Sequence, residues 1–191
     1  MSFLDSLLGR DNPVKSKTDA LFALTTCDLT MQSALDLTAT NNAAISFRPV
    51  STGDWNDLER EINDLLNVST HDSPLKWKWF ADDYGFKWVI LEANEFENLI
   101  ATANMIGDEL TEHGFGAQLL AAIIQYKDND GQQVYMIYNY KRGTFYPFVP
   151  DPHQTQQRLN SEEFRISGTL QKELPIEKDI QSWYPLWGVP L

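Results

Sequence analysis

Two segments of the chain have the pattern of a β-hairpin, and no other feature restricts the fold as strongly. In residues 75–92, apolar and charged side chains alternate up to the turn residues 82–85, after which an apolar run returns. In residues 119–141, an apolar run ends at Asp128-Asn129-Asp130-Gly131 and an alternating run follows. Strands joined by tight turns run antiparallel. The sequence therefore predicts a largely antiparallel sheet, not the parallel sheet of a doubly wound nucleotide fold.

Two helices follow from apolar residues at helical spacing. The first is expected to begin at Asp54 as its N-cap, and its apolar stripe reaches Leu66. The second is expected to begin at Asn94, because Glu97 three residues later completes a capping-box pattern. It should end at Gly114 in a left-handed conformation.

The N-terminal part of the chain has weaker signals. Residues 19–24 and 30–37 are interpreted as two short helices separated by Cys27, and residues 43–49 as a short strand ended by proline. Before them, four apolar residues form one stripe of a short helix: Phe3, Leu4, Leu7 and Leu8. This stripe could dock on the core, on a partner or on a membrane surface, and the core is favoured.

After the second hairpin, residues 144–150 are expected to be extended and at a sheet edge because prolines cannot donate to a ladder. A helix over 161–174, interrupted by Gly168, and a short one over 176–183 should follow. The end, residues 183–191, is too apolar for a free tail and should pack on the body or on a partner.

These elements predict an α+β fold in which a largely antiparallel sheet packs against helices. A length of 191 residues suits a single domain. Within it we distinguish a helical N-terminal extension with the first strand (1–50), an α-ββ-α-ββ core (51–150) and a helical C-terminal segment packed on the core (151–191).

Negative charge is concentrated in one third of the chain. The formal net charge is −12, which argues against nucleic acid as a partner because phosphate binding needs a cationic face. Residues 51–113 contain 14 acidic and 4 basic residues, a net charge of −10, whereas each flank carries −1. Most of this excess falls on the two predicted helices. A pair of solvated helix faces is the simpler interpretation, and a docking face for a basic partner is the alternative.

Three carboxylates, Asp57, Glu61 and Asp64, share one face of the first helix. At this spacing they could hold a hard cation, but no fourth ligand is nearby and Arg60 intervenes. We therefore expect an acidic face without a metal ion.

The chain has no recognisable catalytic motif. It contains no G-x-G-x-x-G, no phosphate-loop Lys, no G-x-S-x-G and no H-E-x-x-H sequence. Its three histidines, His71, His113 and His153, are dispersed, and Cys27 has no neighbouring base to activate it. We therefore predict no catalytic residue and no cofactor. The rival interpretation is an enzyme or small-ligand protein with an aromatic-lined pocket at Trp77, Trp88 and Tyr138.

One segment combines cations with aromatic residues and is the strongest candidate for partner binding. Its candidate residues are Tyr140, Lys141, Arg142, Phe145, Tyr146 and Phe148. They could form a recognition edge for a peptide or a partner chain. The structural alternative is a turn at a sheet edge with both cations in solvent.

The chain also resembles a known family. The resemblance is carried by six stretches that span essentially its full length: residues 3–10, 19–24, 84–88, 113–116, 138–148 and 183–191. They resemble PspAB, the phage shock protein A–associated protein family, and the last two stretches are the most specific. The resemblance implies a bacterial or archaeal cytoplasmic protein linked to phage shock protein A, a coiled-coil protein that protects the inner membrane under envelope stress. It transfers no catalytic residue.

The element order is also similar to the secretion-chaperone-like fold of type III secretion chaperones and YbjN-like proteins. Taken together, we expect a non-enzymatic adaptor or regulator that binds phage shock protein A in the cytoplasm and reaches the inner membrane through that partner. The alternatives are a chaperone-like export or assembly factor and the small-ligand protein described above. No apolar run is long enough to span a bilayer, and residues 1–13 make a poor secretory signal. Peripheral membrane contact and a homodimer stay open.

Overall fold

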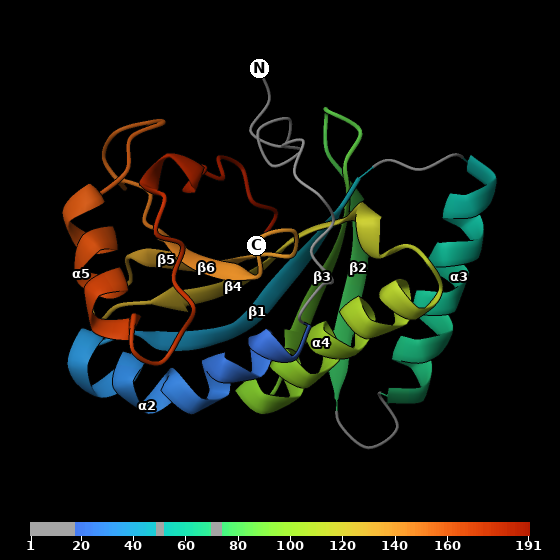
Figure 1. Cartoon of the computed structure of the whole chain (residues 1–191), viewed down its shortest axis with the longest axis horizontal. Coiled ribbons are helices and arrows are strands. Elements are labelled where there is room, and N and C mark those ends of the chain that lie inside the picture. Colours follow the sequence, from blue (N-terminus) through green and yellow to red (C-terminus); the bar gives the residue numbers. More distant parts are fainter. Residues whose placement is uncertain (1–17, 49–51, 70–73) are drawn as a thin grey trace.

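The centre of the molecule is a six-stranded antiparallel sheet with the strand order β2-β3-β1-β4-β5-β6 (Figure 1). The computed structural model describes residues 18–48, 52–69 and 74–191. The strands are β1 (Thr38–Phe47), β2 (Leu75–Ala81), β3 (Lys87–Ala93), β4 (Leu119–Lys127), β5 (Gln133–Asn139) and β6 (Thr144–Phe148). Both predicted hairpins are confirmed, as β2–β3 and β4–β5, and β1 joins them by pairing with β3 and β4.

Helices cover one face of this sheet. They are α2 (Ala23–Leu35), α3 (Thr52–Ser69), α4 (Phe96–Glu112) and α5 (Asn160–Leu170). The described residues also form the short 3-10 turns η1 (Thr18–Phe22), η2 (Gly116–Gln118) and η3 (Ile180–Ser182), the last of them in the C-terminal segment. The apolar stripes of the helices pack with alternate residues of the strands, for example Ala43, Ile45 and Phe47 of β1, in one large core. The predicted α+β fold is therefore confirmed. Among the described residues, no helix is both long and apolar enough to cross a membrane.

The chain's own C-terminal segment covers the opposite face of the sheet. Trp183 and Leu186 are buried there in a second core against strand residues such as Ile137 and Tyr146. Val189 is partly buried against the same cluster. In Figure 1 this red segment lies above the sheet and α2 and α4 lie below it. The expectation that the apolar end packs on the body is confirmed.

The N-terminal helices differ from the prediction. A single helix, α2, replaces the two expected pieces, and Cys27 lies inside it. The reason is a continuous buried stripe at spacings of three and four: Leu24, Cys27, Met31 and Leu35. Burial raises the pKa of the Cys27 thiol to about 12, so this cysteine is a packing residue. Strand β1 is also longer than expected and begins at Thr38. The stripe of Phe3, Leu4, Leu7 and Leu8 lies outside the described residues.

The predicted helix starts are wrong in detail, whereas one predicted end is confirmed. Helix α3 begins at Thr52, so Asp54 is inside it, and α4 has Glu95 as its N-cap with no side-chain cap. Asn94 is instead held by its backbone: its carbonyl oxygen accepts a hydrogen bond from the side-chain amide of Asn41 at 3.0 Å. At the other end of α4, Gly114 has a φ of 83°, as predicted.

The C-terminal elements also differ from the prediction. Helix α5 continues through Gly168 to Leu170, and residues 176–183 are mostly irregular, with an isolated bridge at Ile176 and the short turn η3. No helix forms at the start of this range because Ile176 makes a parallel bridge with Phe145 of β6. The Phe145 N–H donates to the carbonyl of Pro175 at 2.9 Å, and the Glu177 N–H donates to the carbonyl of Phe145 at 2.8 Å.

Candidate functional site

The three predicted acidic residues lie on the outer side of α3. Asp57 and Asp64 are exposed and Glu61 is half-buried, while Leu58, Ile62 and Leu66 of the same helix are buried. Asp57 forms an exposed ion pair with Arg60 at 2.8 Å. In the part of the chain that the structure describes, no three His, Cys, Asp or Glu side chains gather closely enough to hold a metal ion.

Helix α3 is fixed to the sheet by one amide. The Oδ1 atom of Asn63 accepts hydrogen bonds from the indole N–H of Trp77 at 3.1 Å and of Trp79 at 2.9 Å. Both tryptophans belong to β2. The position of α3, and with it the position of the carboxylates, is therefore set by a polar contact in addition to apolar packing.

The C-terminal end of α4 extends this acidic face. His113, directly after α4, has its Nδ1 3.0 Å from the carbonyl oxygen of Glu109. That hydrogen bond, and the charges of Glu61, Glu109 and Glu112, raise the pKa of His113, although burial lowers it. Because Glu61 comes from α3 and the others from α4, the two helices form one surface. We call the set Asp57, Glu61, Asp64, Glu109 and Glu112 the acidic surface.

The predicted basic-aromatic edge does not form an exposed surface. Its four aromatic residues, Tyr140, Phe145, Tyr146 and Phe148, are at most 2% exposed. Tyr140 and Phe145 face the helices, whereas Tyr146 and Phe148 face the C-terminal segment. Of the six candidates, only Lys141, half-buried, and Arg142 reach solvent. A partner-binding role for these two cations stays a prediction.

The chain itself occupies the edge of β6. Besides the backbone bonds at Phe145, the Nε of Arg142 and the Oγ1 of Thr144 both donate to Oε2 of Glu177, the latter at 2.9 Å. Burial would raise the pKa of Glu177, but these hydrogen bonds and one from the Asp179 N–H outweigh it and lower the pKa to about 2. This edge is therefore closed by the segment that follows Leu174.

The rival aromatic pocket is not formed. Trp77 and Tyr138 pack on the helix side of the sheet, whereas Trp88 belongs to the core on the other side. Trp88 donates its indole N–H to Asp82 of the β2–β3 turn at 3.1 Å. The sheet thus separates the three residues that this hypothesis placed around one ligand.

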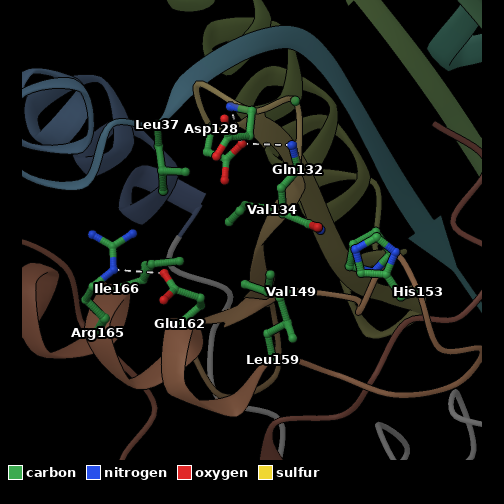
Figure 2. Close-up of a pocket in the computed structure, with 13 residues that line it drawn as sticks. Leu37, Asp128, Gln132, Val134, Val149, His153, Leu159, Glu162, Arg165 and Ile166 are labelled. Atoms are coloured by element: carbon green, nitrogen blue, oxygen red, sulfur yellow. Dashed lines mark hydrogen bonds and ion pairs between the residues drawn. The ribbon is translucent and has the colours of Figure 1, made fainter.

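A pocket of about 470 Å³ that no sequence pattern predicts lies at the other end of the molecule (Figure 2). Four segments surround it: the connection between α2 and β1, the β4–β5 turn with the start of β5, the loop between β6 and α5, and the first turns of α5. Apolar residues line it: Leu37, Val134, Val149, Leu159 and Ile166. Polar residues complete the lining: Asp128, Asp130, Gln132, His153, Glu162 and Arg165. We call this site the turn pocket. Its only local sequence signal was the run 128–131, which by itself indicates a turn.

The polar lining of the turn pocket is held in place. The Oδ1 atom of Asp128 accepts from the N–H groups of Asp130 at 2.9 Å and Gln132 at 2.8 Å. The Gln132 amide donates to the carbonyl of Pro150 at 2.9 Å, so the turn is tied to the loop. Arg165 pairs with Glu162 at 2.8 Å. The lining thus holds three carboxylates against one guanidinium.

Comparison with known proteins finds a family match but no curated or structural relative. No curated protein matches the chain, and no solved structure matches it either. The similarity to secretion-chaperone-like and YbjN-like folds is therefore not confirmed. One family model, described as PspA associated protein B, matches residues 1–191. Since this match spans every strand and helix described above, the chain belongs to the PspA associated protein B family.

Proposed function

We propose that the protein is a non-enzymatic adaptor that binds phage shock protein A through the acidic surface. The observation that carries this proposal is the placement of charge: residues 51–113 hold a net charge of −10, and many of the carboxylates lie on the outer sides of α3 and α4. The family description supports phage shock protein A as the partner. We place the complex in the cytoplasm, with contact to the inner membrane only through that partner.

Electrostatics favour binding over catalysis at this surface. Exposed carboxylates attract an oppositely charged partner over about 8 Å at physiological salt and raise its association rate. Catalytic carboxylates are usually found in clefts, where burial or a like charge shifts their pKa. Asp57 and Asp64 instead lie in solvent on a helix. The pairing of Asp57 with Arg60 adds little stability at such exposure, so these residues are free to serve recognition.

The decisive experiment measures binding of the full chain to its cognate phage shock protein A by calorimetry. The test variant is Asp57→Asn with Glu61→Gln and Asp64→Asn. We expect its affinity to fall by at least about tenfold, since each lost charge contact in an interface removes a fraction of the steering and pairing energy. Raising the salt concentration should weaken wild-type binding and affect the variant less.

A matched control separates the surface from net charge. Asp36→Asn, Asp83→Asn and Glu173→Gln change three exposed carboxylates elsewhere and alter the net charge equally. This variant should bind within about twofold of wild type. Equal losses in both variants would assign the effect to overall charge. Absence of wild-type binding would contradict the proposed function itself.

A further inference from the structure

We infer that the turn pocket binds a cationic amphipathic segment of a protein partner, which places an aliphatic side chain in the pocket and a lysine or arginine against its carboxylates. The inference rests on the proposed function in one respect only, that the occupant belongs to a protein. It concerns a second surface. Helices α3 and α5 lie at opposite ends of the long axis of the molecule (Figure 1), so the turn pocket is remote from the acidic surface.

The apolar lining calls for an aliphatic or aromatic anchor. In Figure 2, Val134 and Val149 lie between His153 and the Glu162–Arg165 pair, and Ile166 and Leu159 lie on the α5 side of the pocket. They come from β5, the β6–α5 loop and α5, and Leu159 is only half-buried. A hollow of about 470 Å³ with such a lining is large enough for a bulky side chain from another molecule.

The carboxylates specify the charge of the occupant. Glu162 is paired with Arg165. Asp128 and Asp130, in contrast, have no ion-pair partner within residues 18–48, 52–69 and 74–191, and Asp130 is exposed. Only Oδ1 of Asp128 is used by the turn. A lysine or arginine fits this arrangement because its methylene stem can cover the apolar lining while its charged end reaches the two aspartates.

The pocket is preformed, so little ordering would accompany binding. The β6–α5 loop is closed on itself by the Asp151 N–H to the Gln157 carbonyl at 2.8 Å and by the Leu159 N–H to the Val149 carbonyl at 2.8 Å. The amide of Gln132 ties the β4–β5 turn to the same loop. Walls fixed in this way lower the entropy cost of docking a segment.

A synthetic helical peptide of leucine and lysine is the first probe. A peptide of the same pattern with glutamate in place of lysine, and spermine, serve as comparisons. In NMR spectra of the ¹⁵N-labelled full chain, we expect the Leu/Lys peptide to shift amide signals of residues 128–134 and 159–166. Equal binding of the Leu/Glu peptide would overturn the inference. Signal shifts confined to α3 would also overturn it. Binding of spermine as tight as that of the Leu/Lys peptide would show a site for small polycations and would overturn the inference of a peptide site.

Charge substitutions then locate the site. Asp130→Lys with Glu162→Gln should weaken the Leu/Lys peptide by at least about tenfold. The matched control is Asp83→Lys with Glu92→Gln, because Glu92 pairs with Lys76 over the same distance as Glu162 with Arg165 and the net charge changes equally. The control should change peptide affinity by less than about twofold. Asp130→Asn is a milder variant in case the double variant is unstable, and an unchanged affinity in it would also count against the site.

The two proposals fail separately. If the Leu/Lys peptide binds the turn pocket but the full chain does not bind phage shock protein A, the proposed function is wrong and the pocket's preference stands. If phage shock protein A binds while the peptide shifts no pocket signals, the pocket inference is wrong and the adaptor function stands.

Discussion

The guanidinium of Arg158 faces the buried carboxylate of Glu163, and its Nε lies 2.9 and 2.8 Å from the two carboxylate oxygens. The same guanidinium donates from Nη1 to the carbonyl of Trp183 at 2.7 Å. Glu163 in turn accepts the N–H of Val149 at 2.9 Å. This pair therefore connects the end of β6, helix α5 and the C-terminal segment in one network.

Removal of the cation from this network should be costly. Arg158→Leu leaves the Glu163 carboxylate buried without its cation, and the expected loss in the free energy of unfolding is about 3–5 kcal/mol. The double variant Arg158→Leu with Glu163→Leu removes the stranded charge and should recover part of that loss. Urea denaturation of both variants measures the difference. A double variant no more stable than the single one would contradict this account.

Glu177 should make the stability dependent on pH in the acidic range. Its pKa is lowered from 4.5 to about 2 by hydrogen bonds that outweigh burial, so its ionised form stabilises the fold. This contribution is present above pH 4.5 and is lost as the pH falls toward 2. At neutral pH, Glu177→Gln should cost about 1–3 kcal/mol and should lessen the loss of stability on acidification.

The control for this prediction is Glu162→Gln, which breaks a more exposed pair with Arg165. It should cost less than about 1 kcal/mol. Denaturant unfolding at neutral pH and near pH 3 measures both variants. Equal costs in the two would show that the contacts of Glu177 with Arg142 and Thr144 contribute no more than an exposed ion pair.

The pKa of His113 depends on the packing of α3 against α4. Its pKa should be above the usual 6.5, and Glu61→Gln should lower it because one of the charges that raise it belongs to Glu61. Because a raised histidine pKa favours the folded state below pH 6.5, this contribution disappears as the pH rises through the folded-state pKa. NMR titration of the imidazole signals measures the shift. Glu97→Gln, in the first turn of α4, is the control and should leave the His113 pKa unchanged.

Two glycines should respond to alanine in opposite directions. At Gly114, φ is 83°, and the N–H of Phe115 reaches the carbonyl of Leu110 at 2.6 Å, the bond that closes a Schellman motif. Alanine there is strained and should cost about 1–2 kcal/mol. Gly168 lies inside α5, where alanine should gain about 0.5–1 kcal/mol. Because an added Cβ meets no atom within 4 Å at either position, thermal unfolding of the two variants compares backbone effects alone.

Local patterns predicted the elements whose chemistry is local. The turn at 128–131 forms because the Asp128 carboxylate accepts two backbone N–H groups, and the end of α4 forms because glycine adopts a positive φ. Cys27 shows the limit of such patterns. The local pattern predicts separate helices on either side of it, but burial of four residues on one stripe keeps the helix continuous. Packing overrides weak propensity there.

A candidate site could be predicted from the sequence only where the solvent exposure of its residues could be predicted. The carboxylates of α3 were correctly expected on an outer face, since their helix buries the opposite side. Tyr146 and Phe148 were expected at an accessible edge, but residues about 40 positions later in the chain cover them. The turn pocket was missed for the same reason, because its lining runs from Leu37 to Ile166. No local pattern indicates which of these distant segments meet.

The segment that covers the second face of the sheet has a consequence for biosynthesis. A ribosome completes all six strands before it adds Trp183 and Leu186. A nascent chain that has reached β6 therefore carries the aromatic side chains of Tyr146 and Phe148 without their cover, next to an unpaired strand edge. Such intermediates aggregate and are bound by chaperones. Addition of residues 183–191 therefore covers a surface through which the incomplete chain is prone to aggregate.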